Sequence, residues 1–375
     1  LYPHNHGIRL ISDTNIKEHI TSLAEILKAH EYKTGFLGLS EIHYNQTRNG
    51  FDDFNLLKWK IRNKIKGYLG VGSAEYSIDN TIDWIKKNKN HKFFFTFHIS
   101  DIHYPYHIPF PYNQNDSDIQ RLYDVTKNKT YKRGDIHFGN VKLPQKEIDY
   151  AISCYDAGIS YIDTQIKRLI DFLKKENLYN DTLIVLCSDH GESLGEHNFY
   201  FMHGYSLYEQ SIKSALIFSN PSLIPNKVDS NVQIIDIMPT ILNFLQIYLI
   251  ENIDGINLFD KQTRDFIFVE SPEENLKGNK RMFLSGIKGK WRVMIVGEWK
   301  IIYIPHPEND IFELYNIKYD SSESNNLIDK GKFIAEKMKK RILEFLDKQN
   351  NEGDVKLENL TEKSKKMLKS LGYLE

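Results

Sequence analysis

The chain has 375 residues, of which 41% are hydrophobic and 26% are charged, and its formal net charge is −1. This length fits one large domain plus a smaller one. A net charge near zero argues against a nucleic-acid-binding or membrane-surface protein, because both need a strong positive field. The two cysteines, Cys154 and Cys187, form no Cys-x-x-Cys pair. This excludes a zinc knuckle and disfavours a disulfide framework, and each cysteine is expected to be a small buried hydrophobe.

Up to about residue 260, predicted strands alternate with predicted helices. Helical periodicity predicts helices over residues 15–30 and 146–176. Short runs of β-branched or aromatic residues predict strands over residues 35–39, 92–97, 182–187 and 214–218. Strands that are apolar throughout and alternate with helices indicate βαβ units around a mostly parallel sheet.

Two segments between these elements need separate interpretation. Residues 112–145 are polar and weakly periodic, which predicts an excursion or lid. The most apolar long window, residues 231–250, contains Asn231, Asp236 and Pro239, so it predicts a core helix rather than a membrane span. No signal peptide is recognisable, but the chain begins without Met, so this observation leaves the compartment open.

After about residue 260 the pattern changes to closely spaced strands without long helices between them. Strands are predicted over residues 264–270, 291–297 and 299–305, and a helix over residues 332–348. This pattern is typical of a small antiparallel sheet with a helix. We therefore predict an α/β domain over residues 1–260 and a C-terminal subdomain over residues 261–375.

Metal-ligand side chains follow two of the predicted strands at the point where each strand ends. The strand at 182–187 leads into Asp189 and His190, and the strand at 92–97 leads into His98, Asp101, His103 and His107. Ligands of open parallel sheets bind beyond the carboxyl ends of the strands. A carboxylate oxygen from Asp189 and an imidazole nitrogen from His190 can form a corner for a divalent metal, and Gly191 permits the close turn that such a corner needs.

Each of these residues also has a plain structural interpretation. A lone Asp-His pair after a strand is more often a helix cap and a surface histidine, although SDHGESLGEH at 188–197 is far more specific. Glu192 and Glu196 can be solvated, His197 can cap a turn, and His98 is better explained as a satisfied histidine at a strand end.

The loop after residue 98 favours a function for His103. Pro105 and Pro109 stiffen the backbone beside it, and a rigid loop suits a residue that donates a hydrogen bond to an oxyanion. The aromatic residues of the loop, Tyr104, Tyr106 and Phe110, are better explained by packing.

Several motifs, spread over nearly the whole chain, resemble the sulfatases of the alkaline phosphatase superfamily. They are LYPHNHGIR at 1–9, GFDDF at 50–54, HYPY at 103–106, SDHGESLGEH at 188–197, IIDIMPTILNFL at 234–245 and ELYNIKYDSSESNNL at 313–327. The resemblance implies an α/β fold, a three-layer α/β/α sandwich with a mostly parallel central sheet, plus a small C-terminal antiparallel sheet and helix.

The resemblance also implies a mechanism. Family members hold one divalent cation between two pairs of side chains, and the second pair falls on Asp189 and His190. The implied cation is Ca²⁺, with Mg²⁺ or Mn²⁺ as alternatives. A formylglycine made from Cys or Ser attacks sulfur. His103 matches the histidine that binds the sulfate oxygens, and His203 falls where many members carry a lysine.

The chain departs from the family at its start. The early Asp-Asp metal pair and the nucleophile motif Cys/Ser-x-Pro/Ala-x-Arg are not in this sequence, so the formylglycine nucleophile that the family implies is not present in it. The chain begins about where the nucleophile helix of the family ends. We therefore expect the N-terminal part of the α/β domain to be missing, and the chain as it stands to bind metal weakly and turn over little.

The implied function is hydrolysis of a small-molecule or carbohydrate sulfate ester at a metal-assisted site, with no nucleic-acid partner and no membrane span. The oligomeric state is not implied. One alternative is a phosphodiesterase, phosphonate hydrolase or phosphoethanolamine-type transferase of the same superfamily, which the identity of the nucleophile distinguishes. The other is a non-catalytic, sulfatase-like remnant.

Overall fold

The structure is a computed structural model. It describes residues 21–38, 48–56, 73–104, 106, 136–137, 139–204, 206–248, 253–260, 264–271, 290–306 and 308–350. Several sequence predictions lie outside these residues: the motif at 1–9, the first part of the helix at 15–30, His107, Phe110 and most of the predicted excursion at 112–145.

A parallel sheet of three strands forms the first part of the fold. Its order is β2 (Asp53–Leu56), β1 (Lys33–Gly38) and β3 (Phe93–Phe97), and both neighbouring pairs are parallel. Helix α2 (Leu23–Ala29) precedes β1, and helix α4 (Ser73–Asn88) lies between β2 and β3 in the chain. The strands predicted at 35–39 and 92–97 are therefore confirmed, whereas the sequence indicates β2 only as part of a motif.

Strands β4 (Ile184–Cys187) and β7 (Leu216–Ser219) pair with each other in antiparallel orientation. Parallel pairing requires a crossover connection, but the chain between them forms only short elements that let it turn back. These are β5 (Ser193–Leu194), the 3₁₀ turn η2 (Glu196–Asn198), β6 (Tyr200–Met202) and the short helix α8 (Glu209–Ile212). The predicted strand at 214–218 therefore exists but runs against its neighbour.

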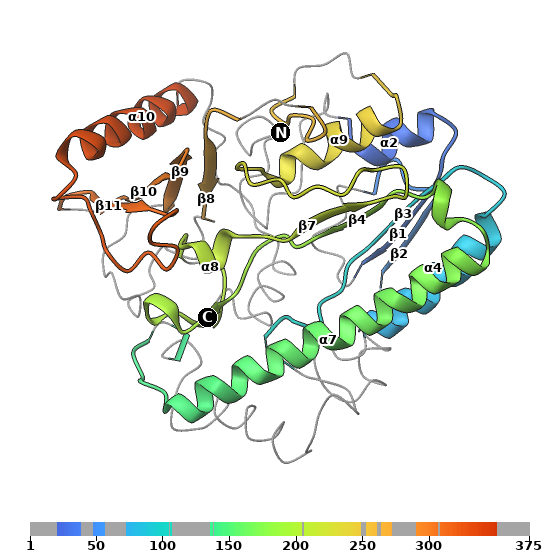
Figure 1. Ribbon diagram of the computed structural model, residues 1–375, viewed down its shortest axis with the longest axis horizontal. Coiled ribbons are helices and arrows are strands. Elements are labelled where there is room, and N and C mark those ends of the chain that lie inside the picture. The colour runs from blue at the N-terminus through green and yellow to red at the C-terminus, as the bar shows by residue number, and fades with distance from the viewer. Residues whose placement is uncertain are drawn as a thin grey trace, which may run out of the picture.

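Helices cover both faces of these strands, which confirms the α/β/α layers (Figure 1). Helices α4 and α7 (Gln145–Lys175) lie on one side, and α2 and α9 (Ile237–Phe244) lie on the other. Buried residues of α4 and α7 form one cluster, against which Phe95 of β3 and Ile184 of β4 both pack. Among the described residues, β3 and β4 share this helical support without hydrogen bonding to each other.

The helix predicted within residues 231–250 is shorter than expected. A 3₁₀ turn, η3 (Ile234–Asp236), leads into α9, which ends at Phe244. The Asp236 carboxylate is fully buried, pairs with Arg264 and accepts the backbone N–H groups of Gln233 and Ile256, so it fixes the start of the helix. In the part of the chain that the structure describes, no helix has the length and hydropathy needed to cross a membrane.

The C-terminal region is an antiparallel sheet with a helix against it, as predicted. The strand order is β11 (Ile311–Asn316), β10 (Trp299–Ile304), β9 (Arg292–Val296) and β8 (Ile267–Glu270). Helix α10 (Lys332–Asn350) covers one face, where Ala335, Met338 and Ile342 pack against the sheet.

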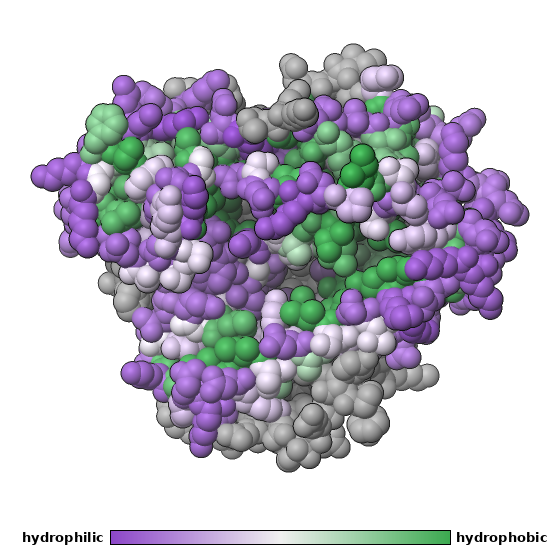
Figure 2. Space-filling view, in the orientation of Figure 1, coloured by the Kyte–Doolittle hydropathy of each residue, from purple (hydrophilic) through white to green (hydrophobic). Residues whose placement is uncertain are grey.

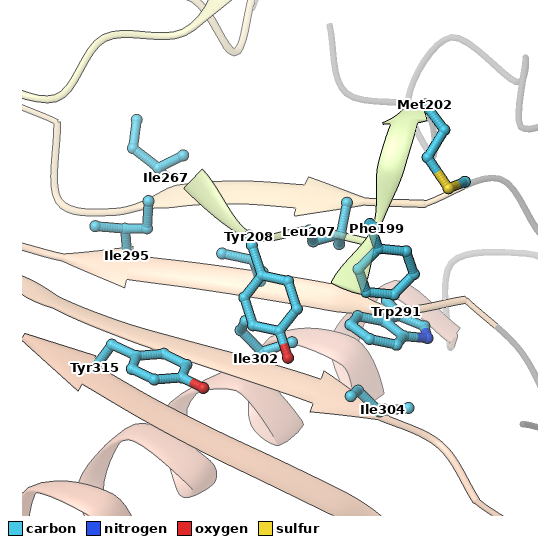
Figure 3. Packing of buried hydrophobic residues seen from close by; sticks show 11 residues of the cluster. Phe199, Met202, Leu207, Tyr208, Ile267, Trp291, Ile295, Ile302, Ile304 and Tyr315 are labelled. Atoms are coloured by element: carbon cyan, nitrogen blue, oxygen red, sulfur yellow. The ribbon is translucent and has the colours of Figure 1, made fainter. Parts of the chain in front are cut away.

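The other face of this sheet packs on the first part of the chain. Phe199, Leu207 and Tyr208 form one buried cluster with Trp291 and Ile302 of the sheet region (Figure 3). This shared core crosses residue 260, so the division into 1–260 and 261–375 stays a prediction. On the face shown in Figure 2, hydrophobic residues gather between α7 and the strands β4 and β7, and the surrounding surface is mostly hydrophilic.

The two cysteines differ in burial. Cys154 lies on α7 and is buried, as predicted, but Cys187 is exposed. The prediction for Cys187 is wrong because the residue is the last of β4, where the strand emerges at the edge that carries Asp189.

Candidate active site

The end of β4 is fixed to the segment that enters β7. The backbone N–H of Ser188 donates to the Ala215 carbonyl at 3.0 Å, and the Ser188 hydroxyl accepts the backbone N–H of Ala215 at 2.8 Å. Asp189 and His190 follow directly. Their backbone therefore leaves the sheet from a defined point.

Gly191 lets the chain approach α8 closely. Its N–H donates to the Ser211 carbonyl at 2.9 Å, and a Cβ placed on it would lie 2.0 Å from the Gln210 carbonyl oxygen. The sequence predicts that a glycine here permits a close turn. The structure gives a different reason, since the constraint is the contact with α8 rather than the backbone dihedral angle.

The side chains of Asp189 and His190 lie close enough to bind one cation together. His190 Nε2 lies 3.6 Å from Asp189 Oδ2. His190 Nδ1 lies 2.7 Å from the Gly191 carbonyl oxygen, and because a carbonyl only accepts, Nδ1 carries the proton. Nε2 then presents its lone pair beside a carboxylate. Metal-binding histidines adopt this arrangement, in which one ring nitrogen donates to a carbonyl and the other binds the metal.

The two side chains therefore fit a divalent cation as a pair of ligands, one oxygen and one nitrogen. Within the ranges that the structure describes, no group of three or more His, Cys, Asp or Glu side chains is placed to hold a metal ion. Asp189 and His190 alone supply too few ligands for a closed site.

His103 and His203 lie in the same cluster as His190. The His203 ring stacks on His190 with the ring centroids 3.8 Å apart, and it meets His103 edge-on with the centroids 5.0 Å apart. The folded chain thus brings together three of the residues singled out from the sequence, from two segments separated by about a hundred residues.

His103 is held as a neutral imidazole. Its Nδ1 donates to the Tyr104 carbonyl at 2.7 Å, which leaves Nε2 as an acceptor. Burial, together with the neighbouring His203, lowers the pKa of His103 to about 4. In the free protein near neutral pH, His103 therefore presents an unprotonated Nε2, and its role as a hydrogen-bond donor to an oxyanion stays a prediction.

Two residues near the cluster are not among those that the sequence selects. From the sequence, Glu192 is interpreted as a solvated side chain. In the structure it is only 9% exposed, and its Oε2 lies 3.5 Å from His203 Nδ1. His98 is half-buried at the end of β3. Burial lowers its pKa; the charge of Asp189 raises the pKa, and the charge of His190 lowers it further. The signal for both residues is their position close to the ends of the two strands.

Other residues of these segments have structural roles. Asp101 is buried, and its carboxylate accepts the backbone N–H of Ala74 at the start of α4 at 2.9 Å. Tyr104 and Tyr106 are buried in the core, as the packing interpretation predicts. His197 stacks on Tyr208, whereas Glu196 is exposed.

Comparison with known proteins identifies the family. The family model described as Sulfatase matches residues 1–247. The choline-sulfatase of Rhizobium meliloti is 30% identical over 151 residues, a match that covers 40% of this chain and 27% of that protein. The matched regions span less than half the length of this and similar curated relatives.

Solved structures share the fold over most of the chain. One, a protein in complex with its substrate D-glucosamine-2-N,6-O-disulfate, has a TM-score of 0.68 and 19% identity, and the match covers 94% of this chain and 86% of that one. The phosphonate monoester hydrolase of Agrobacterium radiobacter has a TM-score of 0.69 and 16% identity, with 97% and 87% covered. Since the family model accounts for more than half of the sequence and the fold agrees with it, this chain belongs to the sulfatase family.

Proposed function

We propose that this chain contributes one side of a site that hydrolyses a sulfate ester with the help of a divalent cation. Asp189 and His190 bind the cation, with Ca²⁺ as the first choice and Mg²⁺ or Mn²⁺ as alternatives. His103 and His203 contact the sulfate group. The substrate is a small-molecule or carbohydrate sulfate ester.

The observation that carries this proposal is the hydrogen-bond geometry of the His190 ring. Its Nδ1 is committed to the Gly191 carbonyl, so Nε2 presents its lone pair beside Asp189 Oδ2. A cation bound there would stabilise the negative charge that develops on the sulfate oxygens during the reaction.

The different surroundings of His103 and His203 suit them to different roles at the sulfate group. His103 offers an unprotonated Nε2, so it can accept a proton or a hydroxyl hydrogen bond. Donation from His103 to a sulfate oxygen requires prior protonation, which a bound anion favours. The buried Glu192 carboxylate lies beside Nδ1 of His203 and orients the His203 ring.

Among the described residues, neither cysteine is assigned as the nucleophile. Cys154 is buried and Cys187 ends β4, and neither lies in a Cys/Ser-x-Pro/Ala-x-Arg motif. The fold is shared with a phosphonate monoester hydrolase, so hydrolysis of a phosphonate or phosphodiester is the second candidate function.

The first test is calcium binding by the metal-stripped chain, measured by isothermal titration calorimetry. Because Asp189 and His190 are the proposed ligands, we expect Asp189→Ala and His190→Ala each to abolish calcium binding. Glu196→Ala, which removes an exposed acid from the same segment, is the matched control. Equal binding by all four proteins would refute the metal role of Asp189 and His190.

The second test compares turnover of an aryl sulfate with turnover of an aryl phosphate diester. Preference for the sulfate, reduced by His103→Gln and His203→Gln, supports the proposal. Preference for the phosphate diester would support the second candidate function.

A further inference from the structure

A buried ion cluster connects the C-terminal sheet to the short helix that supports the site. Lys300 of β10 is fully buried, and its Nζ lies 2.6 Å from Glu323 Oε1 and 3.1 Å from Glu209 Oε1. The Glu323 side chain is also fully buried. Glu209 is the first residue of α8, so one cation of the sheet holds two carboxylates that belong to different segments.

Glu323 also holds the backbone of α8. Its Oε2 accepts the N–H of Glu209 at 2.6 Å. Glu323 has a φ of 53°, in the left-handed region that favours glycine. In this conformation both carboxylate oxygens of Glu323 are engaged, Oε1 by Lys300 and Oε2 by the backbone of α8.

Helix α8 is in turn the support for the metal corner. The Ser211 carbonyl of α8 accepts the Gly191 N–H, and the Gln210 carbonyl lies close to the Gly191 Cα. The Gly191 carbonyl then accepts a hydrogen bond from His190 Nδ1–H. A continuous chain of contacts therefore runs from Lys300 through α8 and Gly191 to His190.

A second connection accompanies the first. His197 stacks on Tyr208 with ring centroids 3.6 Å apart, and His197 Nε2 lies 3.0 Å from the Ser322 carbonyl oxygen. The Tyr208 hydroxyl donates to Glu313 of β11 at 2.9 Å. The segment between β5 and α8 is thus tied to the C-terminal region at more than one point.

We infer that Lys300 is a positioning residue for the site, which acts through Glu209, Glu323 and α8 to hold Gly191, His190 and the stacked His203 ring in place. A buried ion cluster is weak support for stability, because desolvation opposes the attraction between the charges. Its effect here is to fix one geometry of α8. The consequence for catalysis rests on the proposed function, but the positioning itself can be tested without turnover.

The test is amide hydrogen exchange of the full chain, followed by mass spectrometry on peptides that cover residues 188–194. The Gly191 N–H is protected only while α8 stays in place. In Lys300→Met, two carboxylates lose their partner, so exchange in this peptide should rise about tenfold or more. Exchange in α4 should not change. Wild-type exchange in the 188–194 peptide of Lys300→Met would overturn the inference.

The matched control is Lys290→Met. Lys290 is also buried in the C-terminal sheet region, and its Nζ lies 2.8 Å from Glu270 Oε1 at the opposite edge of the sheet from β11. Unchanged exchange at 188–194 in this variant supports the inference. An equal rise would mean that any damage to the sheet loosens the site, and it would overturn the inference.

Two further variants keep the test decisive. If Lys300→Met does not fold, Lys300→Met/Glu209→Gln/Glu323→Gln removes all three charges together, and wild-type exchange at 188–194 in that protein would overturn the inference. Lys300→Arg keeps the charge and should retain most of the protection, which supports the inference. Full loss of protection in Lys300→Arg would contradict a role for the positive charge in holding α8.

Discussion

At the scale of single residues, local hydrogen bonds set the chemistry of the site histidines. His103 and His190 both donate Nδ1–H to the carbonyl of the next residue in sequence. In the neutral imidazole, each therefore carries its proton on Nδ1 and its lone pair on Nε2. The sequence places these histidines at two strand ends, but only the local backbone conformation decides which ring nitrogen carries the proton.

The neutral state of His103 predicts a pH dependence of stability. Burial lowers the pKa of His103 to about 4 in the folded protein, whereas an unfolded histidine titrates near about 6.5. The unfolded state then binds a proton first, so the free energy of unfolding should fall as the pH decreases from 7 to 4, by at most about 3 kcal/mol from this residue.

Urea unfolding of the metal-free protein at several pH values measures this effect. His103→Gln should reduce the loss of stability, whereas replacement of the exposed His91 by Gln should leave it unchanged. An identical pH profile for wild type and His103→Gln would show that His103 is not buried in its neutral form.

At the scale of elements, the short helix α8 determines the path of the Asp189-His190 corner. It is too short to be recognised by periodicity. Gly191 meets α8 so closely that a side chain cannot be accommodated without movement of the backbone.

Gly191→Ala should therefore destabilise the protein by roughly 2–3 kcal/mol and abolish calcium binding. Gly297→Ala is the matched control, because Gly297 has a φ of 59° but a Cβ added to it would meet no atom within 4 Å. It should cost about 1 kcal/mol through strain and leave calcium binding unchanged. Denaturant titration and calorimetry measure both effects. Retention of calcium binding in Gly191→Ala would show that the Asp189-His190 corner does not depend on the contact with α8.

At the scale of the whole molecule, the C-terminal sheet and the site segment share one core. Trp291 of the sheet region is 1% exposed and meets Phe199 and Tyr208 with ring centroids 6.4 Å and 6.1 Å away (Figure 3). Because this core crosses residue 260, the two predicted regions should unfold together rather than as separate units.

Trp291→Ala should lower the free energy of unfolding by about 3–5 kcal/mol and keep a single transition by circular dichroism and tryptophan fluorescence. Phe333→Ala, which removes a side chain that is 80% exposed on α10, should change it by less than about 0.5 kcal/mol. Two separate transitions in either protein would instead favour independent domains divided near residue 260.

Much of the architecture could be predicted because it follows from local patterns. The apolar runs at 92–97 and 182–187 and the long periodicity at 146–176 correspond to β3, β4 and α7. Direction of pairing could not be predicted in the same way. The residues of β7 look like those of the parallel strands, and β7 is antiparallel to β4 because the chain between them forms only short elements and no long crossover helix.

The sequence by itself determined the family and the residues at the strand ends, because motif spacing and strand positions are local properties of the chain. The tertiary structure decided the rest. Burial of Glu192 beside His203, the exposure of Cys187 and the connection from Lys300 to Gly191 all depend on residues that are distant in sequence or on opposite sides of a turn. Such contacts depend on how the segments pack, and packing free energy is shared among many residues rather than encoded in any one motif.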